Sequence, residues 1–469
     1  MYTELKWQNP IENKNPANTH QIIQKNKNKK NYHSSNSRHC KFMRTKPYLI
    51  NVNPREHCIL TQPELSHLPV SLRLYTPIYD GIGNDRVKPY SPAKVNFTFT
   101  IANTMLKLPE STSPSPSTPP RGIKGGYWPS WRAEKFPPSA ISTSYFTHLF
   151  YAFVVPDANN YQILITQTDD KWMKNFTATL HAKTPRAKAF ISIGGGTASP
   201  HTLSNMASNP DSRAAFIDSS VSVARKYGFD GLDLDWEFPH TPQDMSNLSL
   251  LFKEWHEAIE NESSISGKPQ LFLSAAVYFA SNFFLSNIPR AYPVEAINKY
   301  VDFVSPMCYD YHGSWDTSVT GEHALLYDKA SNISTSYGIS SWIKAGIPPK
   351  KLVMGLPLYG RTWQLKSPSE NGIGAPAVGT GPGNNGVMKY IDIVEFNVTN
   401  AEGVVFDEQT VSMYSYAGTD WIGYDGPASI EKKVEFAKAQ GLGGYFFWAL
   451  GYDKDFTLSK TGRFFFFFF

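Results

Sequence analysis

Residues 229–237 read Phe229-Asp230-Gly231-Leu232-Asp233-Leu234-Asp235-Trp236-Glu237, and this stretch decides the fold. From residue 232 onward, apolar and acidic residues alternate strictly. Successive side chains of a strand point to opposite faces, so we predict a strand with three carboxylates on one face. Like charges so close together repel, which raises the pKa of at least one carboxyl group. The pattern indicates a general acid; the alternatives are a solvated strand face or an acidic row that binds a metal.

Seven other short apolar runs accompany this strand, and they alternate with segments of helical periodicity, which is typical of repeated βα units. Eight strands with room for helices between most of them predict a (β/α)8 barrel, whose reaction site lies at the C-terminal ends of the strands. The acidic stretch would close the fourth strand, with its last residue furthest out. The predicted strands are Ile123–Trp128, Phe146–Val154, Ala187–Ile193, Gly228–Glu237, Leu271–Val277, Phe303–Tyr309, Leu352–Leu358 and Gly443–Leu450.

Two helices have recognisable ends. The segment Asp211–Tyr227 follows Asn209, a good N-cap residue, and stops at Gly228. The segment Pro427–Gln440 has apolar residues on one face and is followed by Gly441, which we expect in the left-handed conformation that ends a helix.

Charge is distributed unevenly along the 469 residues. Ten Lys or Arg residues against two Glu residues give residues 1–47 a net charge of +8, and the chain total of +5 leaves −3 for the remainder. The basicity therefore belongs to the N-terminal tail, and the body shows no charge preference for an acidic partner. The 41% of hydrophobic and 14% of aromatic residues favour a globular protein.

Residues 1–120 are predicted to be a poorly ordered extension, first basic and then rich in Ser and Pro. The run Lys25–Lys30 has no apolar periodicity and cannot build a core. A nucleic-acid or nuclear-targeting tail and a misplaced start codon are the alternatives. The run Phe464–Phe469 would invite aggregation if exposed, so we expect 461–469 to be an artefactual or disordered tail.

Signals of compartment are weak. Three cysteines are too few for a disulfide framework, no signal peptide is visible at Met1, and no stretch is apolar enough to span a bilayer. No zinc-like spacing or phosphate-binding glycine loop is present, so we expect no metal and no cofactor. Weak support for secretion comes from Asn-x-Ser/Thr triplets, among them those at Asn175, Asn247, Asn261, Asn332 and Asn397.

The acidic stretch contains the signature Asp-x-x-Asp-x-Asp-x-Glu, and it resembles that of family 18 glycoside hydrolases, the retaining chitinases. Five further segments resemble strands of this family in the expected order, and the resemblance is to plant class V chitinases over residues 122–458. These segments are Gly125–Ser130, Phe146–Phe150, Ser192–Gly195, Met307–Asp310 and Gly444–Trp448.

The resemblance implies a TIM barrel formed by residues 121–363 and 422–460, interrupted after its seventh strand by a small α+β insertion domain. The βα rhythm breaks where the sequence becomes rich in Gly, Pro and Asn, and alternating strands follow. We therefore place the insertion at 364–421, where it would form one wall of a sugar cleft.

The resemblance also implies the catalytic roles. Carboxylates at i and i+2 on one strand lie about 6.6 Å apart at their backbones and point the same way, so they cannot easily flank a sugar. The family solves this with the substrate's own 2-acetamido oxygen as nucleophile. Glu237 would then be the general acid and base, and Asp235 would orient the acetamide and stabilise the oxazolinium intermediate. Asp233 would hold or exchange a proton with Asp235, and Tyr309 would donate a hydrogen bond to the acetamide.

Further positions match family residues around the substrate, although buried aromatic residues in a barrel can simply be core. Tyr127 and Ser192 would steady the inner acid, and Trp448 would form the floor under the sugar. Met307, Asp310 and Arg361 would contact the sugar chain. The other expected sugar contacts are Trp128 and Phe153, with Trp315, Trp363 and Trp421 in loops or in the insertion.

We therefore expect a monomeric chitinase that acts on chitin and chito-oligosaccharides, with no nucleic-acid or membrane partner. Family resemblance places it outside the cell or in the vacuole. The alternative is a catalytically weak, lectin-like chitin-binding protein of the same fold. Such proteins typically lack one of the catalytic residues, whereas all four are present here. Endo-acting enzymes on N-glycans share the acidic motif but generally lack the insertion.

Overall fold

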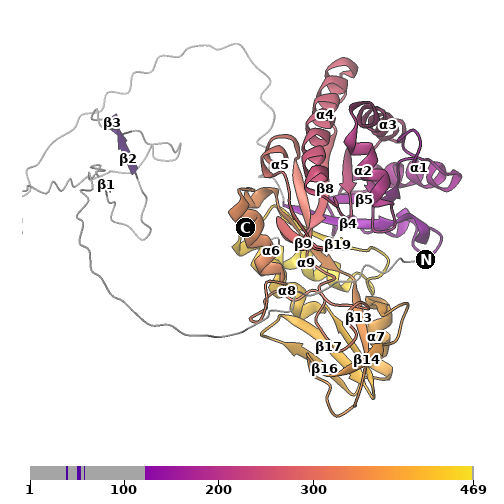
Figure 1. Cartoon of the computed structure of the whole chain (residues 1–469), viewed down its shortest axis with the longest axis vertical. Helices are drawn as coiled ribbons and strands as arrows, with labels where there is room; N and C mark the ends of the chain where they lie inside the picture. The colour runs from indigo at the N-terminus through magenta and orange to yellow at the C-terminus, as the bar shows by residue number, and fades with distance from the viewer. Residues whose placement is uncertain (1–38, 41–49, 54–56, 59–121, 467–469) are drawn as a thin grey trace, which may run out of the picture. The chain divides into compact units, whose positions relative to one another are not determined.

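The computed structural model describes residues 39–40, 50–53, 57–58 and 122–466 of the chain (Figure 1). In the N-terminal part, three short strands pair antiparallel in the order β1 (His39–Cys40), β2 (Ile50–Asn53) and β3 (His57–Cys58). The remainder of the expected N-terminal extension and its Ser/Pro linker lie outside the described residues.

Eight parallel strands form the predicted barrel. Their order is β11-β8-β7-β6-β5-β4-β19-β12, and a parallel bridge between Val304 and Leu352 joins the two end strands. Each strand overlaps a predicted one, although the acidic strand β7 is shorter than expected and ends at Asp235. The strands are β4 (Ile123–Pro129), β5 (His148–Val154), β6 (Lys188–Gly194), β7 (Gly231–Asp235), β8 (Phe272–Tyr278), β11 (Phe303–Met307), β12 (Val353–Pro357) and β19 (Gly444–Trp448).

Helices cover the outside of this barrel (Figure 1). The Asn209 side chain accepts a hydrogen bond from the N–H of Asp211 and begins α3, and Gly228, at φ 75°, ends it as predicted. Gly441, at φ 68°, follows α8. The helices are α1 (Gln167–Ala182), α2 (Pro200–Ser208), α3 (Pro210–Tyr227), α4 (Pro242–Ser266), α5 (Val294–Tyr300), α6 (Thr335–Ala345), α8 (Pro427–Ala439) and α9 (Thr457–Phe466), with single turns η1 (Ser130–Arg132), η2 (Pro138–Ala140) and η3 (Pro349–Lys351).

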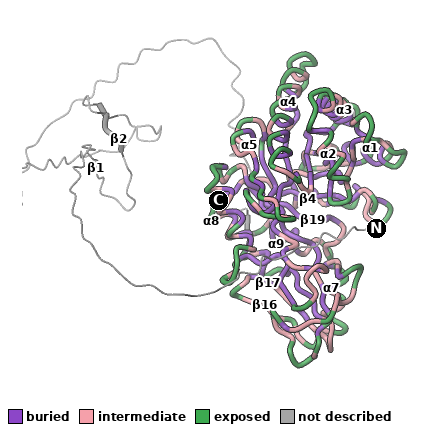
Figure 2. Tube along the Cα trace, viewed as in Figure 1, coloured by how far each residue is buried: buried purple, intermediate pink, exposed green. Residues whose placement is uncertain are grey.

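The barrel strands are mostly buried (Figure 2), and the alternation along them gives two apolar layers. Leu232, Leu234 and Trp236 pack in the outer layer, between the barrel and its helices. The inner layer fills the barrel with aromatic side chains such as Phe190 and Phe446. A shift of β7 by one residue would move its carboxylates into the outer apolar layer, so the pattern fixes the register.

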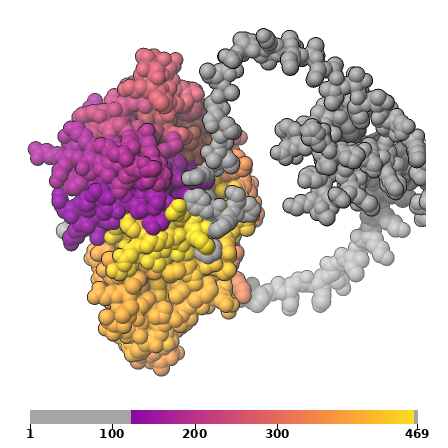
Figure 3. Space-filling model, turned by 180° about the vertical axis from the view of Figure 1, so that it is seen from behind, coloured from indigo at the N-terminus to yellow at the C-terminus, as the bar shows by residue number. Residues whose placement is uncertain are grey.

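The insertion is a second, antiparallel sheet that starts directly after β12. Its order is β14-β13-β18-β17-β16, with β15 also paired to β13. The sheet runs from Tyr359 to Tyr424, beyond the expected limits of 364 and 421 at both ends. In Figure 3 it is the orange surface below the barrel. Its elements are β13 (Tyr359–Leu365), β14 (Ala377–Thr380), β15 (Val387–Lys389), α7 (Tyr390–Thr399), β16 (Gly403–Asp407), β17 (Ser412–Ala417) and β18 (Asp420–Tyr424).

Two further segments bear on the expectations. A hairpin of β9 (Asn282–Leu285) and β10 (Ile288–Ala291) follows the barrel strand β8. Residues 461–466 continue helix α9, which packs on α8, so this part of the expected tail is helical instead. Of the residues that the structure describes, none belongs to a helix with the length and apolar character needed to cross a membrane.

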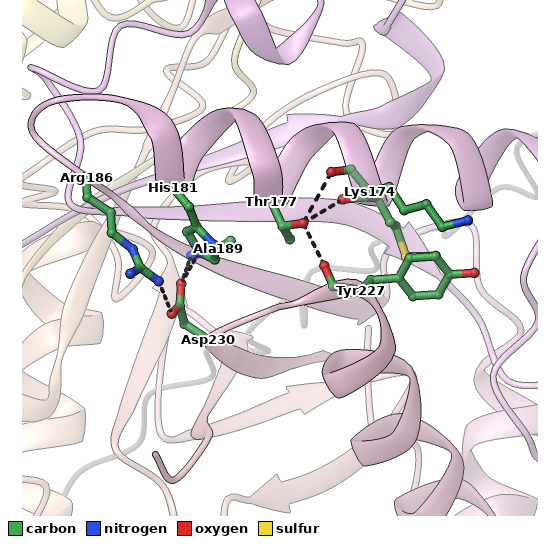
Figure 4. Close-up of polar contacts among 8 residues, drawn as sticks. Lys174, Thr177, His181, Arg186, Ala189, Tyr227 and Asp230 are labelled. Carbon is green, nitrogen blue, oxygen red and sulfur yellow. Dashed lines mark hydrogen bonds and ion pairs between the residues drawn. The ribbon is translucent and has the colours of Figure 1, made fainter. Parts of the chain in front are cut away.

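The first aspartate of the acidic signature, Asp230, anchors the start of β7 at the end of the barrel opposite the site. Its Oδ2 accepts a hydrogen bond from the N–H of Ala189 at 2.8 Å and lies 2.8 Å from Nε2 of His181. Its Oδ1 accepts from the guanidinium of Arg186 at 3.1 Å (Figure 4). One turn earlier in α1 than His181, Thr177 donates to the carbonyl of Tyr227, the last residue of α3, at 2.6 Å. These contacts tie β7 to β6 and α1.

Asp230→Ala is expected to lower the free energy of unfolding by about 1–3 kcal/mol, because it leaves donors of β6 and α1 without their charged acceptor. Turnover per folded molecule should stay near normal, since Asp230 lies far from the C-terminal ends of the strands. Urea denaturation and active-site titration measure the two quantities. Asp218→Ala, on the exposed face of α3, is the control. A loss of turnover without a loss of stability would contradict this structural role.

Candidate active site

Asp233 lies deepest in the site, inside the barrel and fully buried. Its Oδ2 accepts hydrogen bonds from the Tyr127 hydroxyl at 2.9 Å and the Ser192 hydroxyl at 2.7 Å. Its Oδ1 accepts from the Ser274 hydroxyl at 2.7 Å. Burial raises the pKa of Asp233, and the three hydroxyl donors oppose that shift. Strands β4, β6 and β8 thus each supply one donor that holds the inner carboxyl in place.

Ser274 is a site residue that the sequence analysis missed. It lies on β8 beside β7, in direct register with Asp233. The signal was present, because Ser274 is a lone hydroxyl within the otherwise apolar run Leu271–Val277. A buried polar residue in such a strand needs a partner, and the neighbouring acidic strand provides one.

Asp235 ends β7 and is 4% exposed. Gly194 allows the neighbouring strand to approach it closely, because a Cβ at that position would lie 2.0 Å from the Asp235 carbonyl oxygen. The Asp235 side chain interacts with Glu237, while its Oδ1 atom is buried without a hydrogen-bond partner. Burial, followed by the charge of Glu237, raises the pKa of Asp235 well above its ordinary value. One acceptor of this carboxyl is therefore left for a donor that the protein does not supply.

Glu237 lies two residues beyond Asp235, just outside the strand, and is partly exposed. The backbone N–H of Gly196 donates to its carboxylate, and a Cβ at that glycine would lie 3.3 Å from Oε2. Burial, with the nearby charge of Asp310, raises the pKa of Glu237 to about 7. A carboxyl group that keeps its proton to neutral pH is suited to general acid catalysis.

The raised pKa of Glu237 predicts the alkaline limb of the pH profile. The general acid must carry its proton, and the protonated fraction falls as the pH rises through about 7. We therefore expect kcat/KM to decline tenfold per pH unit above about 7. Initial rates on a soluble chromogenic substrate across pH 4–10 measure this. A kcat/KM that stays constant to pH 9 would contradict the assignment.

Asp310 follows β11 and faces the same site from another strand. Its Oδ1 accepts from Nε of Arg361 at 2.9 Å and from the Tyr359 hydroxyl at 2.7 Å, and His323 Nδ1 lies 3.6 Å away. Burial alone would raise the pKa of Asp310, but the Arg361 guanidinium and the neighbouring donors hold it well below its usual range. Asp310 is thus a fixed anion beside Glu237.

Aromatic side chains line the opening of the barrel. Tyr309 lies close enough to Asp235 and Glu237 for their charges to raise the pKa of its hydroxyl, after burial as the main cause. The Trp448 ring stacks on Phe153, with centroids 5.5 Å apart, and meets Tyr127 edge-on. Met307 lies in the same inner layer.

Trp131 is a second residue that the sequence analysis missed. Its side chain is 59% exposed, and its ring lies 6.2 Å from Trp448 and 6.3 Å from Phe153. It extends the aromatic surface outward from the barrel and is available for stacking on a sugar ring. The signal that could have identified Trp131 is its position in the loop after β4, directly after the segment Gly125–Ser130 that resembles the family.

Three tryptophans that we expected to contact sugar lie elsewhere. Trp128 is fully buried in the outer layer against Trp172 and Phe176, because it points away from the barrel interior that its neighbour Tyr127 faces. Trp363 and Trp421 are also fully buried and pack against each other as cross-strand partners in the insertion core. None of the three presents a ring to a ligand.

Trp315 does lie beside the site. The guanidinium carbon of Arg361 lies 4.9 Å from the centre of its ring, next to Asp310. Cys308, by contrast, is a buried free thiol. Among residues 122–466 and the three short N-terminal strands, no group of three His, Cys, Asp or Glu residues is arranged to hold a metal ion.

Comparisons with known proteins agree with this geometry. Residues 124–453 match the family described as glycosyl hydrolases family 18. The chain is 51% identical over 341 residues to a class V chitinase from Medicago truncatula, covering 72% of this chain and 88% of that protein.

Solved structures are similar as well. The GH18 chitinase from Cycas revoluta in complex with (GlcNAc)3 superposes with a TM-score of 0.70 at 42% identity, covering 73% of this chain and 98% of that one. A chitinase-like agglutinin from Robinia pseudoacacia superposes with a TM-score of 0.67 at 41% identity, with 73% and 98% covered. The fold thus occurs in both an enzyme and a protein named as an agglutinin, and the residues of the site must distinguish the two.

Proposed function

The chain belongs to glycosyl hydrolase family 18, and on that basis we propose that it is a chitinase with a retaining, substrate-assisted mechanism. It hydrolyses β-1,4-linked N-acetylglucosamine polymers and oligomers through an oxazolinium intermediate. The observation that carries this proposal is the Asp235–Glu237 pair, in which one carboxyl has a pKa of about 7 and the other keeps an unpartnered buried oxygen.

Glu237 is the acid that protonates the glycosidic oxygen and then the base that activates water. Its position outside β7 exposes it more than Asp235, as contact with the leaving oxygen requires. Partial burial, followed by the charge of Asp310, raises the pKa of Glu237 and keeps it protonated before the reaction. After the aglycone leaves, the ionised carboxylate accepts a proton from the attacking water.

The nucleophile is the acetamide oxygen of the substrate. The nearby carboxylate that follows a different strand, Asp310, is a poor nucleophile, because Arg361 and Tyr359 already bind its Oδ1. The free Oδ1 of Asp235 is suited to accept the acetamide N–H. Once Asp235 has passed its proton to Asp233, its carboxylate balances the developing oxazolinium cation. The Tyr309 hydroxyl donates a hydrogen bond to the acetamide oxygen. Asp233 stabilises the inner end of the three acids of the site.

Sugar rings stack on Trp448, with Trp131 and Trp315 further along the cleft. Phe153, Met307, Asp310 and Arg361 line the site around the bound sugar. Tyr127 and Ser192 act on the substrate only through Asp233. The partners are chitin and chito-oligosaccharides, and we propose that the protein acts as a monomer without a nucleic-acid or membrane partner.

We further propose that the protein is secreted or vacuolar. Three glycosylation triplets within residues 122–466, at Asn175, Asn261 and Asn332, present an exposed asparagine. Asn247 is buried, and Asn397 is partly buried and donates a hydrogen bond to the Tyr424 hydroxyl. These exposed positions can carry glycans on the folded surface, which is where N-glycosylation occurs.

Product analysis tests the proposed function and separates it from a lectin-like role. The purified protein is incubated with N-acetylglucosamine hexamers, and the products are resolved by size and anomeric form with proton NMR. We expect shorter oligomers, first as the β-anomer. Binding without any cleavage would favour the lectin-like alternative, and initial release of the α-anomer would exclude a retaining mechanism.

A further inference from the structure

The loop that carries Glu237 into α4 needs support of its own, because β7 ends before it. On one side, this support comes from the start of α4. The backbone N–H groups of His240 and Thr241 donate to Asp244 Oδ2 at 2.8 and 3.0 Å, and the Thr241 hydroxyl accepts from the Asp244 N–H. This capping box fixes the far end of the loop, but it does not contact residues 238 and 239.

The other side of the loop packs against the β9–β10 hairpin. Phe238, which follows Glu237, meets Tyr278 edge-on at 5.2 Å and Phe283 at 6.0 Å between ring centres. Tyr278 and Phe283 in turn stack on each other at 4.2 Å. The hairpin is therefore a wall against which the residue next to the catalytic acid rests.

Arg290 on β10 makes the polar contact between this hairpin and the loop. It is 3% exposed, its Nη1 donates to the Pro239 carbonyl at 2.8 Å, and its Nη2 donates to the Leu285 carbonyl at 2.6 Å. Its guanidinium carbon lies 4.7 Å from the centre of the Phe283 ring. One cation thus holds both strands of the hairpin and the second residue after Glu237.

This arrangement is costly for folding. Within the described residues, Arg290 forms no ion pair with a carboxylate, although the charge of Asp244 favours its cationic form. Its Nε atom is buried without a hydrogen-bond partner. A buried charge without a carboxylate partner loses hydration that carbonyl oxygens replace only in part. Arg213, which is 4% exposed, instead pairs with Glu254 through two bonds of 2.7 Å. The comparison indicates that Arg290 serves the loop more than it serves stability.

We propose that Arg290 is a positioning residue for Glu237. By holding the Pro239 carbonyl, the guanidinium fixes the loop backbone, and with it the point from which the Glu237 carboxyl delivers its proton. The inference rests on the proposed role of Glu237 as the acid. A catalytic group displaced by about 1 Å loses about 100-fold in rate, so a loosened loop lowers kcat.

The test uses Arg290→Met, which keeps an unbranched side chain but has no donor, and Arg290→Lys, which keeps a cationic donor group at the end of the side chain. We expect Arg290→Met to lower kcat by about 10- to 100-fold with KM changed less than about threefold, and to shift the alkaline limb of the pH profile. Arg290→Lys should show at most half of the decrease in log kcat that Arg290→Met shows, because its ammonium can still donate to the Pro239 carbonyl.

Arg213→Met is the matched control, since it also removes a buried guanidinium but does not touch the loop. It should lose stability and keep its kcat per folded molecule and its pH profile. An Arg290→Met variant that folds with normal kcat and pH profile would overturn the proposal. If Arg290→Met does not fold, Arg290→Lys provides the test. A normal kcat and a normal alkaline limb of its pH profile would overturn the proposal, and a reduced kcat at constant KM would support the proposal.

Glu237→Gln separates this proposal from the proposed function. If Glu237→Gln turns over normally, the function assigned to the acid fails. If Glu237→Gln is inactive while the Arg290 variants keep normal kcat, only the positioning role fails.

Discussion

Glu237→Gln is expected to reduce turnover of chitin oligomers by at least about 10²–10⁴-fold while oligomer binding is kept. The amide retains the shape of the carboxyl group and its ability to accept the Gly196 N–H. It has no proton to deliver at useful pH and cannot activate water in the second step. Single-turnover kinetics and calorimetric titration with a chitin tetramer measure the two effects.

The control for this variant is Glu257→Gln, an exposed position on α4 outside the site. It should leave both turnover and binding unchanged. Near-normal turnover by Glu237→Gln would remove this residue from its role, and loss of binding together with turnover would point to a misfolded cleft.

Asp235→Asn is expected to lower kcat by about 10²–10³-fold, because an amide cannot balance the positive charge that develops on the oxazolinium ring. A substrate with an activated leaving group needs no general acid, so it can restore turnover by Glu237→Gln in the first step. Asp235→Asn keeps the general acid, so such a substrate should not restore its turnover. Rates on a chitin oligomer and on an aryl glycoside compare the two variants. Full recovery on the aryl glycoside would contradict the role of Asp235 in stabilising the intermediate.

Much of the barrel could be predicted because successive side chains of a strand point to opposite faces. Alternation along 232–237 puts the leucines in the outer layer and the acids in the barrel, and the structure has both as predicted. The eight strands follow from apolar runs of the right length. Helix ends at Gly228 and Gly441 follow from backbone conformations that glycine adopts easily.

The errors have a common cause, which is that a resemblance between segments does not say which way a side chain points. Trp128 neighbours the inward-facing Tyr127, so strand alternation alone would have placed it outside. Trp363 lies two residues after Arg361 on β13, so both side chains point to the same face of the sheet. Trp421 of the adjacent strand, however, covers the Trp363 ring. That contact joins residues far apart in sequence, and local patterns do not reveal it.

The supporting residues were hidden for a related reason. Ser274 and Arg290 act on the acidic stretch only after β8 and the hairpin have been placed beside it. Each is a polar residue in an otherwise apolar or turn-like segment, a signal that shows a partner is needed but does not name the partner. Such residues become interpretable only with the strand order.

Cleavage of matched oligomers with and without N-acetyl groups tests the substrate-supplied nucleophile most directly. A chitin hexamer and its fully deacetylated counterpart are compared at saturating concentration, so that kcat and not binding decides the outcome. The acetamide oxygen contributes an effective molarity worth up to about 7–11 kcal/mol. Among the described residues, the carboxylate that faces the site from beyond another strand, Asp310, is already bound by Arg361 and Tyr359. We predict turnover of the acetylated hexamer and none of the deacetylated one; comparable kcat values for the two would contradict the mechanism.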